Sequence, residues 1–306
     1  MSKLTPATGS MIKGTLYGLL AVAIWAIYMS FTRSAVSDSL TPFDIVVMRF
    51  GVAGIIMLCW TLWYCPNMFG GVGLYRGIAL AAAAGPVFIL VASAAFIYVP
   101  LAHGAVLQPS TAALSSIAAA VFILKEKVTI YRIAGAVVII SGITLMATGS
   151  NATLGVDAWK GYVLSVLAGL CWAIFTILIR RWSISGLAAT AAVSVISAII
   201  TVPLFFIFDT VERISALPTE TLIAQLLVQG VLAGVVAIVA YGRAITHLEA
   251  SGAALFPALV PAAALLVGIP ITGEWPTVIE WIGALMATIG LMIAVGVFKQ
   301  SRIEGV

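Results

Sequence analysis

The composition of this chain excludes a soluble globular protein. Of its 306 residues, 62% are hydrophobic and 8% are charged, and its mean hydropathy is +1.18. Soluble domains are about 45–50% apolar and about 25% charged. The net charge of +4 does not indicate a nucleic-acid partner, because the sequence has no run of basic residues. We therefore expect an all-α integral membrane protein whose surroundings are a lipid bilayer.

Ten apolar stretches follow one another along the chain. Each is long enough to cross a hydrocarbon core of about 30 Å as a helix. The first is too long for a cleaved signal and is expected to remain as a helix. In chain order, we expect helices over 14–36, 42–65, 74–98, 103–124, 130–148, 159–182, 186–208, 221–243, 250–271 and 277–297.

The second half of the sequence repeats the first. A proline, a glutamate and a tryptophan keep their register in an otherwise apolar chain, which chance matching of Gly and Ala would not produce. We expect two five-helix repeats, over residues 1–149 and 150–306. The aligned pairs include Trp25/Trp172, Arg33/Arg180, Pro109/Pro257, Glu126/Glu274, Thr129/Thr277, Gly135/Gly283 and Gly142/Gly290.

The number of helices in each repeat predicts their relative orientation. Because five is odd, the second repeat must enter the membrane from the opposite side, so the repeats are inverted. Lys and Arg gather on the cytoplasmic side of membrane proteins, which predicts cytoplasmic termini and an inner-membrane location. On this topology the inner side receives Lys3, Lys13, Arg76, Lys125, Lys127, Arg132, Arg180, Arg181, Arg243, Lys299 and Arg302, and the outer side Arg33, Lys160 and Arg213.

The three cysteines predict neither a disulfide nor a metal site. Cys59, Cys65 and Cys171 lie within or at the ends of apolar stretches, without the paired spacing of zinc ligands. A free cysteine in such a place behaves as a small buried hydrophobic residue. We expect no cofactor and no metal.

The repeated pattern resembles the EamA-type domain of the drug/metabolite transporter superfamily. It comprises Gly-Ala, a mid-helix Pro, a Glu at the helix end and two glycines seven residues apart, as in GAVLQPSTAALSSIAAAVFILKEKVTIYRIAGAVVIISG and GAALFPALVPAAALLVGIPITGEWPTVIEWIGALMATIG. The opening helices GTLYGLLAVAIWAIYMSFTR and GYVLSVLAGLCWAIFTILIRR are also similar to the family's. Lys125-Glu126-Lys127 departs from the family's Leu-Gly before the Glu. The resemblance implies ten helices around a central solute site, and outward transport of amino acids, other metabolites or drugs.

Aromatic residues near the middle of the first and sixth helices are the leading candidates for contact with a solute. Trp25 and Trp172 lie away from the interfacial belts where tryptophan concentrates. Tyr28 and Phe175 each follow a tryptophan by three residues and share its helix face. The repeat symmetry predicts that the two faces approach one another and hold a flat or apolar solute. The alternative is packing between helices or against lipid.

Uncharged polar residues within the apolar stretches are further candidates. A buried amide or hydroxyl needs a partner in a medium without water. That partner is either a solute or a neighbouring helix, and the second alternative is the commoner one for Ser and Thr. The residues expected in the substrate site are Ser93, Gln108, Thr176 and Gln229, with Ser115, Ser116 and Gln225 nearby.

Four residues are expected to act in gating or as hinges. Arg49 and Arg243 are expensive to place in an apolar medium and should pair or face water. We interpret Arg49 as a gate or anchor rather than a ligand. Pro109 and Pro257 are equivalent by the repeat, and both are expected to bend their helices.

The remaining ionisable residues near the helix ends are expected to have structural roles. Arg33 and Arg180 are expected to be interfacial anchors, and His103 to be solvated or a cap. Glu126 and Glu274 are expected to cap the next helix.

Three functions remain to be distinguished. The leading one is export or facilitated movement of small organic solutes such as amino acids. A small-cation multidrug antiporter normally needs a carboxylate buried in the membrane, and the middle of the first and sixth helices has none. A membrane-embedded enzyme is the third, but the sequence lacks H-E-x-x-H and G-x-S-x-G. Because the ionisable groups lie near the membrane faces, we expect transport without a strict need for a proton gradient.

Overall fold

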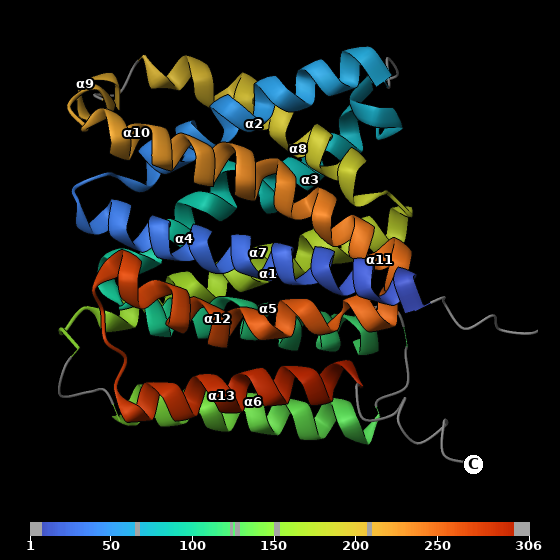
Figure 1. Ribbon diagram of the computed structural model, residues 1–306, viewed down its shortest axis with the longest axis vertical. Coiled ribbons are helices and arrows are strands. Elements are labelled where there is room, and N and C mark those ends of the chain that lie inside the picture. The colour runs from blue at the N-terminus through green and yellow to red at the C-terminus, as the bar shows by residue number, and fades with distance from the viewer. Residues whose placement is uncertain are drawn as a thin grey trace, which may run out of the picture.

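The structure is a computed structural model that describes residues 8–64, 68–122, 125, 129–149, 154–206 and 210–296. Cys65, Glu126 and Lys127 lie outside the described residues. Within them the chain is helical and contains no strand. The expected all-α fold is confirmed. The long helices lie side by side in one bundle (Figure 1).

Nine stretches of the described residues are long and apolar enough to cross a membrane. In one of them α3 and α4 act together, and in another α10, η2 and α11 do. The remaining long helix, α5, has 22 residues and is interrupted by His103, Gln108 and several hydroxyl groups. The first repeat comprises α1 (Thr8–Ser37), α2 (Pro42–Tyr64), η1 (Met68–Gly71), α3 (Leu74–Ala84), α4 (Pro86–Tyr98), α5 (Leu101–Phe122) and α6 (Ile130–Gly149).

The second repeat follows the same order. It comprises α7 (Ala158–Trp182), α8 (Gly186–Phe205), α9 (Thr210–Ser215), α10 (Thr219–Gln225), the π-helix η2 (Leu226–Val236), α11 (Ala237–Ala253), α12 (Leu255–Thr272) and α13 (Val278–Val295). Most ends agree with the sequence to within a few residues. The helix expected to end at residue 243 runs on to Ala253, and its middle is a π-helix.

The repeats are inverted, as contacts between α6 and α13 show. These equivalent helices run antiparallel, because Gly135 lies against Gly290 whereas Gly142 lies against Gly283. A Cβ on Gly135 would come within 2.6 Å of the Gly290 carbonyl oxygen, and one on Gly142 within 2.7 Å of the Gly283 oxygen. In the sequence repeat, Gly135 is equivalent to Gly283 and Gly142 to Gly290, so one of these two contacts becomes the other when the repeats are interchanged. A two-fold axis in the membrane plane requires this relation.

Helices of one repeat pack against helices of the other. Helix α1 of the first repeat lies between α11 and α12 of the second repeat. The equivalent helix α7 of the second repeat lies between α4 and α5 of the first. Gly18 of α1 faces Phe256 of α12, and Gly169 of α7 faces Thr111 of α5. Glycine allows this close approach of helices in an apolar medium. The interface between the repeats is therefore an apolar core, and the outer surface of the bundle also carries large apolar side chains such as Ile55 and Leu266.

The two ends of the bundle are distinguishable. We call the end at which α1 finishes the Arg33 end, and the opposite one the Arg243 end. The Arg33 end, at the left of Figure 1, holds the starts of α2 and α13 and the short helix α9.

Candidate functional site

The two mid-helix tryptophans occupy equivalent positions across the repeat interface. Trp25 packs against Tyr241 of α11, and Trp172 packs against Phe88 of α4, with ring centroids 5.4 Å apart in each pair. Phe175 lies 5.3 Å from Trp172 on the same helix. Each tryptophan therefore has its own aromatic partner on the third helix of the opposite repeat. The expected approach of Trp25 to Trp172 is not formed in this structure.

A polar cluster lies one helical turn from Trp25, toward the Arg33 end. The Arg49 guanidinium carbon sits 4.8 Å from the centroid of the buried Tyr28 ring, and Arg49 Nη2 donates a long 3.4 Å hydrogen bond to the Ala233 carbonyl. Arg49 Nη1 is buried and has no hydrogen-bond partner within the described part of the chain. Among the described residues, no carboxylate forms an ion pair with Arg49.

Two glutamines of the second repeat complete this cluster. Gln229 is fully buried, and its Nε2 donates to Thr32 Oγ1 at 3.1 Å and to Gln225 Oε1 at 3.4 Å. Thr32 in turn donates to the Tyr28 carbonyl at 2.8 Å. Gln229 Oε1 is buried and accepts no hydrogen bond from any residue that the structure describes. We call these five residues, Tyr28, Thr32, Arg49, Gln225 and Gln229, the Arg49 cluster.

The π-helix η2 positions this cluster. Gly230 and Gly234 let α2 approach, since a Cβ on Gly230 would lie 2.4 Å from Val52 Cβ and one on Gly234 2.8 Å from Ala53 Cβ. The approach brings Arg49 to the Ala233 carbonyl. Stretches of π-helix are rare and occur frequently at functional sites.

The other predicted site residues lie on α4, α5 and α7. Gln108 Nε2 donates to the Ala92 carbonyl at 3.2 Å, beside Ser93, whose buried hydroxyl oxygen has no partner. These two residues lie together. Thr176 donates to the carbonyl of Trp172 at 2.9 Å, one turn back on its own helix. Such back-bonding is a common way to satisfy a hydroxyl in a helix, and it favours the structural interpretation of Thr176.

The two prolines that are expected to form paired bends lie at different places in their helices. Pro109 lies in the interior of α5, and Pro257 lies in the first turn of α12. The chain breaks at Ala254, between α11 and α12, in the turn that precedes Pro257. A proline removes the hydrogen bond to the carbonyl four residues before it, so this break lies where Pro257 should cause one. Arg243 is exposed on α11.

An ion pair joins the two repeats at the Arg33 end. Arg33 Nε lies 2.6 Å from Glu274 Oε1, and Arg33 also donates to the Phe96 carbonyl. Glu274 Oε2 accepts the backbone N–H of Leu101 at 2.8 Å. Glu274 therefore caps α5 in the other repeat, not the next helix as expected. Arg33, expected to be an anchor, is its partner.

Two further ion pairs join the repeats at the same end. Arg213 of α9 binds both carboxylate oxygens of the fully buried Asp44, at 2.9 and 3.0 Å. His103 Nε2 lies 2.9 Å from Glu280 Oε1, and its Nδ1 is 3.0 Å from the Tyr162 hydroxyl. His103 is 3% exposed, so the expectation of a solvated residue is wrong. Glu280 also forms a capping box with Thr277 at the start of α13.

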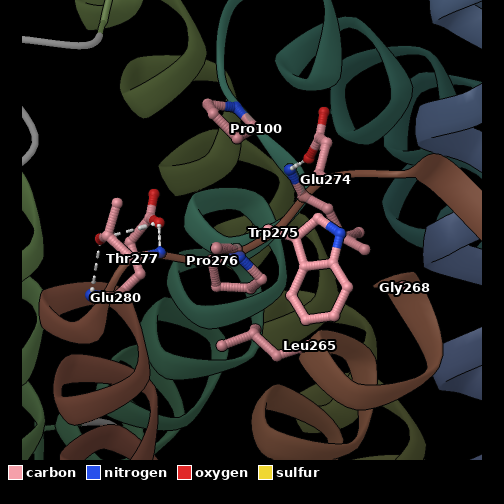
Figure 2. A pocket seen from close by; sticks show the side chains of 10 residues that line it. Pro100, Leu265, Gly268, Glu274, Trp275, Pro276, Thr277 and Glu280 are labelled. Atoms are coloured by element: carbon pink, nitrogen blue, oxygen red, sulfur yellow. Dashed lines mark hydrogen bonds between the residues drawn. The ribbon is translucent and has the colours of Figure 1, made fainter. Parts of the chain in front are cut away.

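A cavity of about 310 Å³ opens beside these contacts. Figure 2 shows Trp275 and Pro276 over it, with Glu274 bonded to the start of α5 and Glu280 bonded to Thr277. Both carboxylates are already engaged by protein groups. The cavity is lined by Pro100, Leu101, Ala102, Leu265, Gly268, Glu274, Trp275, Pro276, Thr277 and Glu280.

Comparison with known proteins identifies the family. The sequence matches the model of the EamA-like transporter family twice, at residues 12–148 and 159–296. The chain belongs to the EamA-like transporter family. The resemblance to the drug/metabolite transporter superfamily is thus confirmed, and with it a multi-pass membrane transporter of small solutes.

A solved crystal structure shares the fold of this EamA-like chain. It superposes with a TM-score of 0.60 over 92% of this chain and 95% of that one, at 17% sequence identity. The similarity supports the arrangement of the helices and says nothing of the solute. No curated protein matches the sequence.

Thr32 and Gln225 are the cluster members that the predicted site omitted. Thr32 follows Tyr28 by four residues and lies on the same helix face, and Gln225 precedes Gln229 by four. This spacing was the available signal, but a hydroxyl or amide on an apolar helix is usually a packing residue.

Proposed function

We propose that this EamA-like protein exports or facilitates the movement of small organic solutes, such as amino acids or related metabolites, by alternating access. One observation carries the proposal: three ion pairs, each joining one repeat to the other, lie together at the Arg33 end. Contacts between inverted repeats on one side of a central site are what a rocking mechanism makes and breaks.

The distribution of Lys and Arg supports an inner-membrane orientation in which the Arg33 end faces outward. Both termini then lie in the cytoplasm. On this proposal the structure is closed to the outside. A solute then enters from the cytoplasm through the Arg243 end and leaves when the Arg33 end opens.

The energy of the three ion pairs is compatible with a reversible gate. Arg33 and Glu274 are 20% and 28% exposed, and such pairs contribute about 0–1 kcal/mol. The pairs that hold Asp44 and His103 are more buried, and hydrogen bonds to charged groups contribute about 1.5–3 kcal/mol each.

The small-cation antiporter is less well supported. Neither α1 nor α7 contains Asp or Glu, and Asp44, Glu274 and Glu280 each face a basic partner. A carboxylate already held by Arg or His is a poor site for exchange of protons against cations.

A charge swap tests the proposal. Amino acids, amines and nucleosides are first screened by thermal shift of the purified protein, and those that stabilise it are tested for counterflow in proteoliposomes. Arg33→Glu and Glu274→Arg each place like charges together, and each should slow counterflow by about tenfold, the factor given by about 1.4 kcal/mol. The double variant should recover part of the rate, because it restores the ion pair but not the hydrogen bonds to Leu101 and Phe96.

The matched control is Arg181→Gln, an exposed residue at the end of α7, which should transport at the wild-type rate. A double variant that regains thermal stability but not counterflow would show that the pair is structural only. Absence of counterflow for every stabilising solute would contradict transport by exchange.

A further inference from the structure

The Arg49 cluster contains a cation without a counter-charge among the described residues. Arg49 lies seven residues beyond Pro42, the first residue of α2, or about 10 Å into the membrane from the Arg33 end at 1.5 Å per residue. A guanidinium at such a depth is expected to pair with an anion or to face water. Its protein contacts are one aromatic face and one long hydrogen bond. The cluster is short of one negative charge.

The same cluster is short of one hydrogen-bond donor. The Thr32 hydroxyl donates to the Tyr28 carbonyl, so its oxygen can only accept from Gln229. The amide group of Gln229 that faces Thr32 is therefore the nitrogen, and the carbonyl oxygen Oε1 is left free. Among the described residues, Arg49 thus keeps a buried, unpaired donor and Gln229 a buried, unpaired acceptor, and both residues belong to the same cluster through Tyr28 and Thr32.

These two unpaired atoms match the two charged groups of an α-amino acid. A carboxylate accepts hydrogen bonds in the plane of a guanidinium, and an ammonium donates to an amide oxygen. We propose that the Arg49 cluster binds the carboxylate of an amino acid through Arg49 and its ammonium through Gln229 Oε1. This inference rests on the proposed function, and it moves Arg49 from the gating group to the substrate site.

The solute's side chain would lie toward the Arg243 end. Trp25 precedes Tyr28 by one turn in that direction and packs against Tyr241, and both rings are partly exposed. This aromatic pair fits an apolar or aromatic side chain. The repeat symmetry does not produce a second site of this kind, because α8, the equivalent of α2, carries no charged residue.

The first test needs no variant. The standard L-amino acids are titrated into the purified full-length protein by isothermal calorimetry. Each one that binds is compared with its C-terminal amide and with the matched acid that lacks the amino group. The amide should bind at least about tenfold more weakly, because it leaves Arg49 without an anion. The acid should also bind more weakly, but by less. Equal affinity for an amino acid and its amide would overturn the proposal.

The second test uses variants. Arg49→Gln should abolish the difference in affinity between each amino acid and its amide. Arg49→Lys should keep part of this difference, and the control Arg181→Gln should keep all of it. If Arg49→Gln does not fold, Gln229→Leu is tested instead. It should reduce the difference in affinity between the amino acid and the matched acid that lacks the amino group.

Failure of this inference differs from failure of the proposed function. If no amino acid binds while an amine or nucleoside shows counterflow, the chain is a transporter but the Arg49 cluster is not an amino-acid site. If amino acids bind with the predicted preference and no counterflow occurs, the site stands and the transport mechanism does not.

Discussion

Single residues in this chain have roles that their sequence neighbourhoods do not reveal. Glu274 lies beside the start of α13, yet it binds Arg33 and the start of α5. Thr277 and Glu280, three residues apart, cap α13 instead. The sequence indicates that a carboxylate is needed near a helix end, but which helix it caps depends on how the two repeats meet. That information lies in contacts between residues more than 170 positions apart.

The Arg49 cluster shows the same limit. The sequence identifies Arg49 and Gln229 as residues that need partners, because polar groups in apolar helices are expensive to leave unpaired, and it identifies Tyr28 by its place on the helix face of Trp25. Their convergence was not predictable. It requires a particular rotation of α2 and a π-helix at residues 226–236, and no regular 3.6-residue pattern predicts a change of helix type.

Replacement of Trp25 by Ala should impair transport more than stability. The ring is partly exposed, so its loss should lower the free energy of unfolding by less than the roughly 3–5 kcal/mol of a fully buried tryptophan. Counterflow should fall by about tenfold or more if the ring contacts the solute. Trp172→Ala, the equivalent change, is measured beside it. Equal proportional loss of transport and thermal stability would assign both rings to packing.

At the scale of elements, sequence reasoning succeeded where a local pattern determines the structure. Apolar length placed the helices, and the odd number per repeat predicted their inversion. It was less accurate for the end of the eighth helix, which runs past its apolar stretch to Ala253. The helix breaks in the turn before Pro257, so the proline indicates the place of the break but the apolar stretch does not.

Gly142→Ala should destabilise the protein by opening the contact between α6 and α13. A Cβ there would lie 2.7 Å from the backbone oxygen of Gly283, and backbone cannot move aside as a flexible side chain can. We expect a decrease of about 1–3 kcal/mol in the free energy of unfolding, measured in detergent by chemical denaturation.

Gly242→Ala is the control for this prediction. No atom lies within 4 Å of a Cβ at Gly242, which is in the helix α11. Alanine is favoured over glycine in a helix by about 1 kcal/mol, so this variant should be as stable as the wild type or slightly more so. A Gly142→Ala variant that matches it would show that the α6–α13 contact tolerates separation.

For the whole molecule, we expect the Arg33 end to face outward and both termini to lie in the cytoplasm. Exposed Glu220 lies at the Arg33 end and exposed Arg181 at the opposite end. In a background without native cysteines, Glu220→Cys should react with a membrane-impermeant maleimide on intact cells, and Arg181→Cys only after permeabilisation. The reverse result would place the termini outside and the closed end inside.

Transport should proceed without a proton gradient. The arginine of the proposed site does not lose its proton at physiological pH, and the acids nearest the repeat interface are bound to basic groups at one end. Counterflow of a stabilising solute, with equal pH on both sides, should therefore persist when a protonophore is added. Uptake that occurs only under an imposed pH gradient would implicate the buried His103 and its partner Glu280 in proton exchange.

The glycine contact between α6 and α13 has a consequence for how such a chain can arise. Both of its sides are made by equivalent residues, so it has the self-complementary form of a homodimer interface. A half-length ancestor could have paired with a second copy of itself inserted the other way up. Such a dimer would have carried two copies of every charge, including two arginines equivalent to Arg49. Fusion into one chain removes that constraint, and the helix equivalent to α2 here has no charged residue at all.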